Sequence, residues 1–144
     1  MKEKLIISAC LLGEPCRYDG KSVNKIDISR ILEKYDIVPI CPEIYGGLPT
    51  PRTPSERSGD RVVMKDGRDV TDNFNRGALS ALNIARLCGA RKALLKAKSP
   101  SCGKGEIYDG SFSGKLTAGN GVAAEMLISE GISVFSENEI DKLA

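Results

Sequence analysis

Residues 93–103 read ALLKAKSPSCG, an apolar run that ends in a turn of small residues carrying one cysteine. Short apolar runs bounded by turn residues are typical of buried strands. Two other segments have the same design: the run at 6–10 (IISAC) ends in Cys10, and the run at 37–41 (IVPIC) ends in Cys41. The pattern predicts three buried strands that each deliver a cysteine at the carboxyl end.

The composition predicts one soluble domain that spans residues 1–144. The chain is 41% hydrophobic and 28% charged, with a net charge of +2. No run approaches the roughly 20 apolar residues that cross a membrane, and the start, MKEK, is too acidic for a secretory signal. The small charge and the scarcity of aromatic residues do not favour nucleic acid as a partner. We therefore expect a cytoplasmic protein with neither a nucleic-acid nor a membrane partner.

The chain has no histidine but five cysteines. Without histidine there is no Ser-His-Asp triad, no Cys-His dyad and no histidine metal ligand. A general base would have to be a carboxylate, a lysine, a cysteine or a tyrosine. An odd number of cysteines in a reducing compartment does not favour a disulfide framework. Metal binding or catalysis is the better interpretation of those cysteines that are not simply buried.

Strand and helix patterns alternate along the chain. Strands are expected at 4–9, 37–40, 93–97 and 132–136, and helices at 27–34, 71–88, 117–129 and from 137 onward. The long helix would be capped by Thr71 or Asp72 and would end before Gly89. Loops are expected between the strands and their helices, at 10–20 and 41–52. The Asp66-Gly67 pair predicts a hairpin between 61–65 and 68–71.

This order of elements predicts an α/β protein. We expect a single-domain Rossmann-like three-layer fold with a mainly parallel sheet of about four strands plus a β-hairpin excursion. In open parallel sheets, ligands bind outside the carboxyl ends of the strands. Cys10, Cys41 and Cys102 should therefore lie on one edge, where they can converge on one cofactor. Cys88, on the apolar stripe of the long helix, is expected in the core.

Three thiolates without histidine are typical of a soft metal centre. Zinc usually takes four ligands, or three plus water, often from a CxxC pair, which this chain lacks. An iron–sulfur cluster bound by three cysteines would leave one iron open as a Lewis acid. Each cysteine can also be a small buried residue with no ligand. Cys16, six residues after Cys10, is a fourth ligand, a resolving thiol or a loop residue.

Polar residues near the three cysteines are candidates for the chemistry. Glu43 lies two residues after Cys41 and, in a chain without histidine, is the leading candidate for proton transfer; the alternative is an exposed loop glutamate. Ser99 and Ser101 can donate hydrogen bonds to a ligand. Lys98 can stabilise an anion or pair with Glu43.

Three motifs occur in order along nearly the whole chain. They are SACLLG with RYDG at 8–20, CPE followed by GGL and PR at 41–52, and KSPSCG at 98–103. In combination they resemble the thiouracil desulfidase (TudS) family, which was long classed as a domain of unknown function. The resemblance implies a [4Fe-4S] cluster held by Cys10, Cys41 and Cys102. It also implies that Glu43 is the acid/base residue and that Ser99 hydrogen-bonds the substrate or water.

The reaction that the resemblance implies is a desulfidation without net redox change. The open iron would bind the sulfur of a small thiolated base such as thiouracil, and water would replace C=S by C=O with release of sulfide. The protein would be a monomer or a homodimer. Two other functions use the same residues: a non-catalytic iron–sulfur or sulfur-binding module, and a thiol redox protein with Cys10 and Cys16 as its exchangeable pair.

Overall fold

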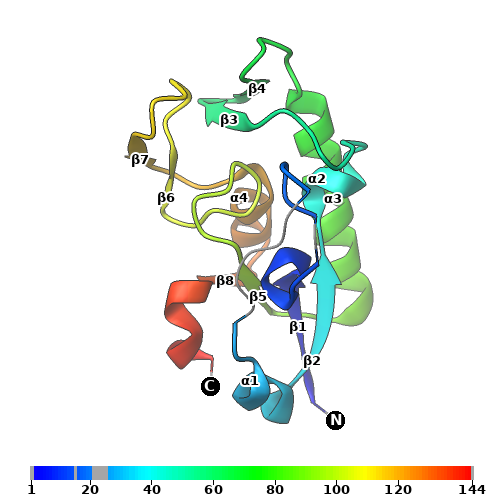
Figure 1. Cartoon of the computed structure of the whole chain (residues 1–144). Helices are drawn as coiled ribbons and strands as arrows, with labels where there is room; N and C mark the ends of the chain where they lie inside the picture. Colours follow the sequence, from blue (N-terminus) through cyan, green and yellow to red (C-terminus); the bar gives the residue numbers. More distant parts are fainter. Residues whose placement is uncertain (1, 15, 21–25, 144) are drawn as a thin grey trace.

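A parallel four-stranded sheet forms the centre of the computed structural model, which describes residues 2–14, 16–20 and 26–143 (Figure 1). In spatial order its strands are β2 (Tyr35–Ile40), β1 (Glu3–Ser8), β5 (Lys92–Leu95) and β8 (Ser133–Ser136). All three neighbouring pairs run parallel. The expected α/β fold with a parallel sheet of four strands is confirmed.

Helices cover both faces of this sheet. On one face, α3 (Thr71–Cys88) and α4 (Val122–Ser129) pack against alternate strand residues such as Ile6 and Leu95. On the other face, α1 (Ser29–Lys34) and the 3-10 helices η1 (Ala9–Leu12) and η2 (Glu137–Lys142) share a core with Leu5, Ile7 and Leu94. Along each strand, successive residues point alternately to one face and to the other, and both faces are buried. The expected three layers are therefore confirmed.

The long helix α3 forms as predicted and ends at Gly89, which takes the left-handed conformation (φ 73°) that favours glycine. Its start differs from the prediction, because neither Thr71 nor Asp72 is the cap. The Asp69 carboxylate accepts the Thr71 N–H at 2.9 Å, and the Thr71 hydroxyl accepts the Val62 N–H at 2.9 Å. No helix in the described part of the chain is both long and apolar enough to span a membrane.

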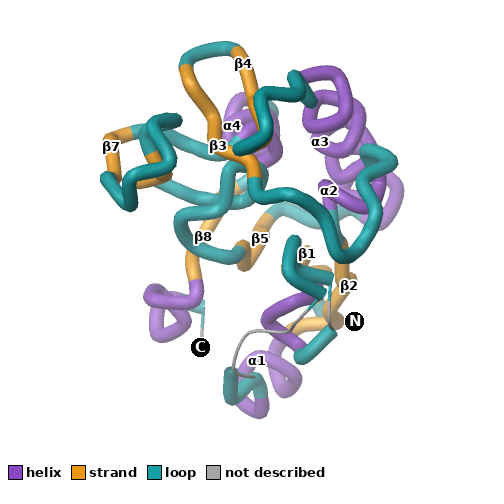
Figure 2. The backbone as a smooth tube through the Cα atoms, turned by 45° about the horizontal axis from the view of Figure 1, so that its top comes forward, coloured by secondary structure: helices purple, strands orange, loops and turns teal. Residues whose placement is uncertain are grey.

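The predicted turn at Asp66-Gly67 forms, and β4 (Arg61–Met64) pairs on both of its sides. After the turn, Val63 and Asp69 form an antiparallel bridge, and the Val70 N–H donates to the Val62 carbonyl at 2.9 Å. This pairing is short because α3 begins at Thr71, and the longer antiparallel partner of β4 is β3 (Ser55–Ser58), which precedes it. This hairpin stands beyond the carboxyl end of the sheet (Figures 1 and 2).

A second hairpin, which the sequence did not predict, joins β6 (Glu106–Tyr108) to β7 (Leu116–Ala118). β7 occupies the start of the helix that was expected at 117–129, and α4 begins only at Val122. Gly119 explains the late start. Its φ of 155° is a backbone conformation that glycine adopts readily and that no right-handed helix contains, and Gly121 then caps α4 in extended backbone.

Two short helices lie in stretches that were expected to be loops. η1 follows β1 directly, and a single turn, α2 (Pro42–Tyr45), follows β2. Pro42 suits the first position of a helix because its missing N–H would have no partner there. As a result, Cys10 lies inside η1 and Cys41 lies at the N-cap of α2, one short step beyond the strand ends.

Candidate active site

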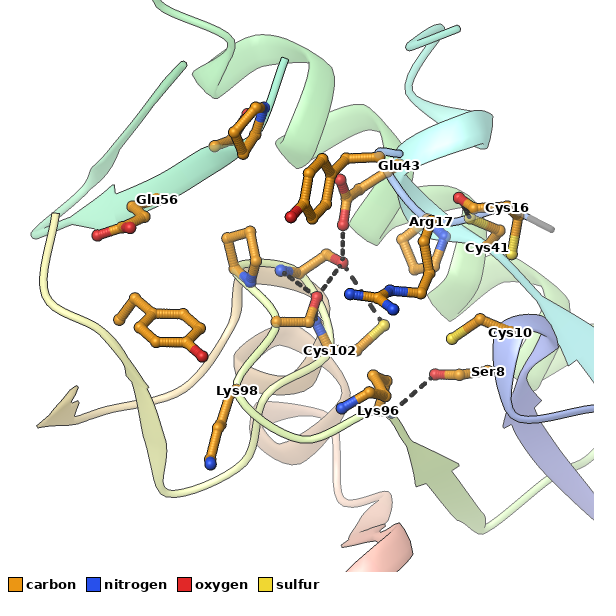
Figure 3. A pocket seen from close by; sticks show the side chains of 18 of the residues that line it. Ser8, Cys10, Cys16, Arg17, Cys41, Glu43, Glu56, Lys96, Lys98 and Cys102 are labelled. Atoms are coloured by element: carbon orange, nitrogen blue, oxygen red, sulfur yellow. Dashed lines mark hydrogen bonds between the residues drawn. The ribbon is translucent and has the colours of Figure 1, made fainter. Parts of the chain in front are cut away.

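The structure brings Cys10, Cys41 and Cys102 to one cavity of about 480 Å³ at the carboxyl end of the sheet. Cys10 and Cys102 point toward one another across this space, and Cys41 lies beside Cys16 (Figure 3). All five cysteines of the chain are free thiols, and Cys88 is the one that does not line the cavity. Cys88 packs against the core from α3, as predicted.

The turn that carries Cys102 is docked onto the start of α4. The first backbone N–H groups of a helix have no partner inside the helix, and α4 has no side-chain cap. The turn supplies the acceptors: the Pro100 carbonyl accepts the Val122 N–H and the Ser101 carbonyl accepts the Ala123 N–H, each at 2.8 Å. Any side chain at Gly121 would overlap the backbone of Ser101. Helix α4 therefore fixes where Cys102 lies.

The segment that carries Cys41 is held against α3 by a similar close approach. A side chain at Gly77, on α3, would overlap the Pro42 carbonyl, and one at Gly46 would overlap the Asn73 carbonyl. The Asn73 side chain also donates to the Gly46 carbonyl at 2.9 Å. Backbone contact at two glycines places α2 against the longest helix of the fold, and this placement orients Glu43.

Glu43 lies at the end of a chain of hydroxyl groups. Its Oε2 accepts the Ser101 hydroxyl at 3.1 Å, and the Ser101 oxygen lies 3.0 Å from the Ser99 oxygen. The Ser99 oxygen already accepts the N–H groups of Ser101 (3.2 Å) and Cys102 (3.1 Å). Its own hydrogen is thus available to Ser101, so the donors run from Ser99 through Ser101 to the carboxylate. Ser101, not Ser99, is the serine that contacts Glu43.

Arg52 holds the other carboxylate oxygen of Glu43, and sequence reasoning gave it no role. Its Nε donates to Glu43 Oε1 at 3.2 Å, and its side chain is only 3% exposed. The same guanidinium donates to the carbonyls of Cys16 (3.0 Å) and Pro49 (3.2 Å) and to the Thr50 hydroxyl (3.0 Å). Arg52 therefore ties the first loop of the chain to the second. Arg52 ends the CPE–GGL–PR motif, so the sequence marks the residue, but only the long-range contact reveals what it does.

The surroundings of three cavity thiols, Cys16, Cys41 and Cys102, raise their pKa values. Burial raises the pKa of the Cys102 thiol to about 12, although the hydroxyls of Ser101 and Ser8 bond to its sulfur and oppose this. A hydrogen bond with Cys16 and burial raise the pKa of Cys41. A hydrogen bond with Cys10 raises the pKa of Cys16 to about 11. Because metals bind thiolates, a metal centre here would form with release of protons.

The two remaining candidates from the sequence, Cys16 and Lys98, lie in different parts of the site. Cys16 is buried and its thiol contacts those of Cys10 and Cys41, so it belongs to the sulfur side of the cavity. Lys98 is exposed, has a left-handed backbone (φ 67°) and points away from Cys102 (Figure 3). It does not pair with Glu43, whose ionic partner is Arg52.

Comparison with known proteins places this chain in a family. Residues 5–139 match the model of the 2-thiouracil desulfurase family. The chain belongs to this family. It is 38% identical to the uncharacterized protein YbbK of Bacillus subtilis (strain 168), over 96% of this chain and 99% of that protein.

A solved structure of a second relative has the same fold. The [4Fe-4S]-dependent thiouracil desulfidase TudS superposes with a TM-score of 0.94 and is 49% identical in sequence. The match covers 99% of this chain and 95% of that one, so the sheet, both hairpins and the cavity described above fall inside it. The family resemblance that the three motifs indicated is confirmed.

Proposed function

We propose that this member of the 2-thiouracil desulfurase family is a [4Fe-4S]-dependent desulfidase that converts thiouracil to uracil and releases sulfide. The observation that carries the proposal is the convergence of Cys10, Cys41 and Cys102, which come from three distant segments, beside the Glu43–Ser101 pair in one cavity. The likeness to a [4Fe-4S]-dependent thiouracil desulfidase at 49% identity over 99% of the chain supports it.

The donor set fits an iron–sulfur cluster better than a single metal ion. Among the described residues, no three His, Cys, Asp or Glu side chains are placed to hold one metal ion. A single zinc ion needs its sulfur ligands at about 2.3 Å from a common point. A four-iron cluster instead takes each cysteine on a different iron, so its ligands lie farther apart. We assign Cys10, Cys41 and Cys102 as those ligands.

When bound by three cysteines, the cluster supplies an iron without a protein ligand, a Lewis acid for the substrate's soft sulfur. The residues of the chain have the remaining tasks. Glu43 would take a proton from the attacking water, directly or through the Ser101 hydroxyl at 3.1 Å. Arg52 keeps the carboxylate aimed at Ser101, since it holds Oε1 and leaves Oε2 for the serine. Ser99 orders the turn and completes the row of hydroxyls.

Metal analysis and product analysis on one sample test this proposal. Protein reconstituted without oxygen should contain about four irons and a similar amount of acid-labile sulfide per chain. The same sample should convert thiouracil to uracil and release one equivalent of hydrosulfide. A protein that loads iron but turns over no thiolated base would instead be the iron–sulfur storage or delivery module considered above. A protein that takes up no iron would contradict the proposal.

A further inference from the structure

Arg17 brings into the cavity a positive charge that pairs with no acidic side chain among the described residues. The residue lines the cavity, is half-buried and extends inward toward the side where Cys10 and Cys102 lie (Figure 3). Within the described ranges, its guanidinium makes no ion pair, and its recorded contact is with the Tyr18 ring at 5.8 Å. A half-buried guanidinium without a protein counter-ion is well suited to bind an anionic ligand.

The carboxylates that line the cavity are already engaged elsewhere. Glu43 is paired with Arg52. Glu56 accepts the backbone N–H groups of Gly110 (2.9 Å) and Phe112 (3.2 Å) and so fastens the turn between β6 and β7. The described carboxylates that line the cavity are therefore not paired with Arg17, and its guanidinium is available to an anion that the cavity binds.

The loop around Arg17 is fixed in place from both sides. The Arg52 guanidinium donates to the carbonyl of Cys16, and the Arg52 backbone N–H donates to the carbonyl of Tyr18. Arg17 lies between these two anchored residues, and its own carbonyl accepts the Gly20 N–H at 2.9 Å. The backbone from which the Arg17 side chain extends is thus held in place by the protein itself, which lowers the cost of binding a ligand there.

We propose that Arg17 is an anion-binding residue that holds the substrate's sulfur as it leaves as hydrosulfide; this inference rests on the proposed function. In the hydrolysis, the electron pair of the carbon–sulfur bond stays with sulfur, and a water oxygen forms the new bond to carbon. One proton of that water ends on sulfur and the other passes to solvent through Glu43. Negative charge therefore grows on sulfur, beside three thiolates, where a guanidinium stabilises it best.

Hydrosulfide binding tests this role without requiring turnover. Sodium hydrosulfide is titrated into oxygen-free, cluster-loaded protein, and binding is followed by the absorption of the cluster. Arg17→Gln should bind hydrosulfide about ten- to a hundredfold more weakly, the loss expected for a hydrogen bond to a charged group. Arg17→Lys should keep most of the affinity, because the charge remains. The reduction potential of the cluster should fall in Arg17→Gln, since a nearby positive charge favours the reduced form.

Lys65→Gln is the matched control, because it removes one positive charge from an exposed residue that lines the same cavity. It should leave hydrosulfide affinity unchanged. The assignment is wrong if Arg17→Gln binds like the wild type, if Lys65→Gln loses as much, or if the glutamine and lysine variants lose equally. If Arg17→Gln does not load iron, Arg17→Lys decides; failure of both to load iron would make Arg17 a structural residue.

Thiouracil turnover by the wild-type sample separates this inference from the proposed function. Turnover together with unchanged hydrosulfide binding in Arg17→Gln would overturn only the role of Arg17. Absence of iron or of turnover in the wild type would overturn the proposed function itself.

Discussion

The sulfur side and the polar side of the cavity are built in opposite ways. On the sulfur side, four thiols from three separate segments line the cavity, and burial raises the pKa of Cys102 among them. On the polar side, Arg52, Glu43 and Ser101 already form a continuous set of hydrogen bonds. No buried side-chain nitrogen or oxygen in the described part of the chain lacks a partner. The contrast indicates that one side binds a cofactor and the other positions a proton-transfer group.

The largest expected effect comes from removing a sulfur. Cys102→Ala should lose both the iron and the activity, because the cluster loses one of the three ligands assigned to it. Cys88→Ala is the matched control, since Cys88 lies on α3 outside the cavity, and it should keep the iron content of the wild type. Iron per chain after anaerobic reconstitution measures both. Equal iron in the two variants would show that Cys102 is not a ligand.

Glu43→Gln should impair proton transfer without affecting cluster binding. The amide keeps the shape of the side chain and cannot accept a proton, so kcat should fall by about 10²- to 10⁴-fold while iron content stays unchanged. Glu56→Gln is the control, because its amide oxygen can still accept the N–H groups of Gly110 and Phe112. Steady-state uracil formation is the measurement. A Glu43→Gln enzyme that retains full kcat would remove Glu43 from the proton-transfer role.

Arg52→Gln should weaken the link between the two loops. Removal of one partner from a buried ion pair leaves the other charge uncompensated, so we expect about 3 kcal/mol of lost stability and a lower kcat. Arg61→Gln is the comparison, since its pair with Asp69 is exposed (70% and 41%) and contributes little. Denaturant unfolding measures both free energies. Equal losses of unfolding free energy in the two variants would show that the Arg52–Glu43 pair stabilises the fold no more than an exposed ion pair.

Gly121→Ala should displace the turn that carries Cys102. The added methyl group meets the backbone of Ser101, and overpacking of this kind costs about 1–3 kcal/mol. Because the Cys102 turn must shift, the variant should also lose iron faster to a chelator. Gly131→Ala is strained at φ 85° but faces open space, so it should lose stability without faster iron loss. The same rate of iron loss in both variants would show that the close contact at Gly121 does not position the Cys102 turn.

The smallest predicted effect lies outside the cavity. The Ser136 N–H, together with Lys104 and Lys142, lowers the pKa of Glu139 to about 2. A carboxyl whose pKa is lower when folded stabilises the fold above its ordinary pKa of 4.5, and this contribution is lost as pH falls toward 2. The melting temperature of Glu139→Gln should therefore be lower than that of the wild type near neutral pH and approach it in acid. A constant difference at every pH would contradict this.

The parts of the fold that could be predicted are those with a strong local pattern. Buried strands such as β1 and β5 are short apolar runs, and α3 has a helical stripe that ends at Gly89. The meeting of the cysteines was also predictable, because parallel strands put their carboxyl ends on one edge. By contrast, β3 reads SERS, which has no apolar alternation, and its pairing with β4 makes it a strand.

The site residues that sequence reasoning missed act through contacts between distant segments. Arg52 has a role in the site because it contacts Glu43 and the carbonyl of Cys16, which lies 36 residues away in the sequence. Arg17 lines the cavity from a loop whose backbone Arg52 holds in place. Both arginines stand in motifs of the sequence, Arg17 in RYDG and Arg52 in PR, and those motifs are the signal that singles them out. Residue type and strand position were sufficient to find Glu43 and the three cysteines, whereas the contacts of the two arginines needed the three-dimensional structure.

One isotope measurement tests the central claim, that the chain hydrolyses a carbon–sulfur bond without redox change. Cluster-loaded protein is given thiouracil in oxygen-18 water, without oxygen and without added reductant. The account predicts uracil that carries the heavy oxygen and hydrosulfide in equal amount, over many turnovers. Unlabelled uracil, or turnover that stops until a reductant is added, would contradict it.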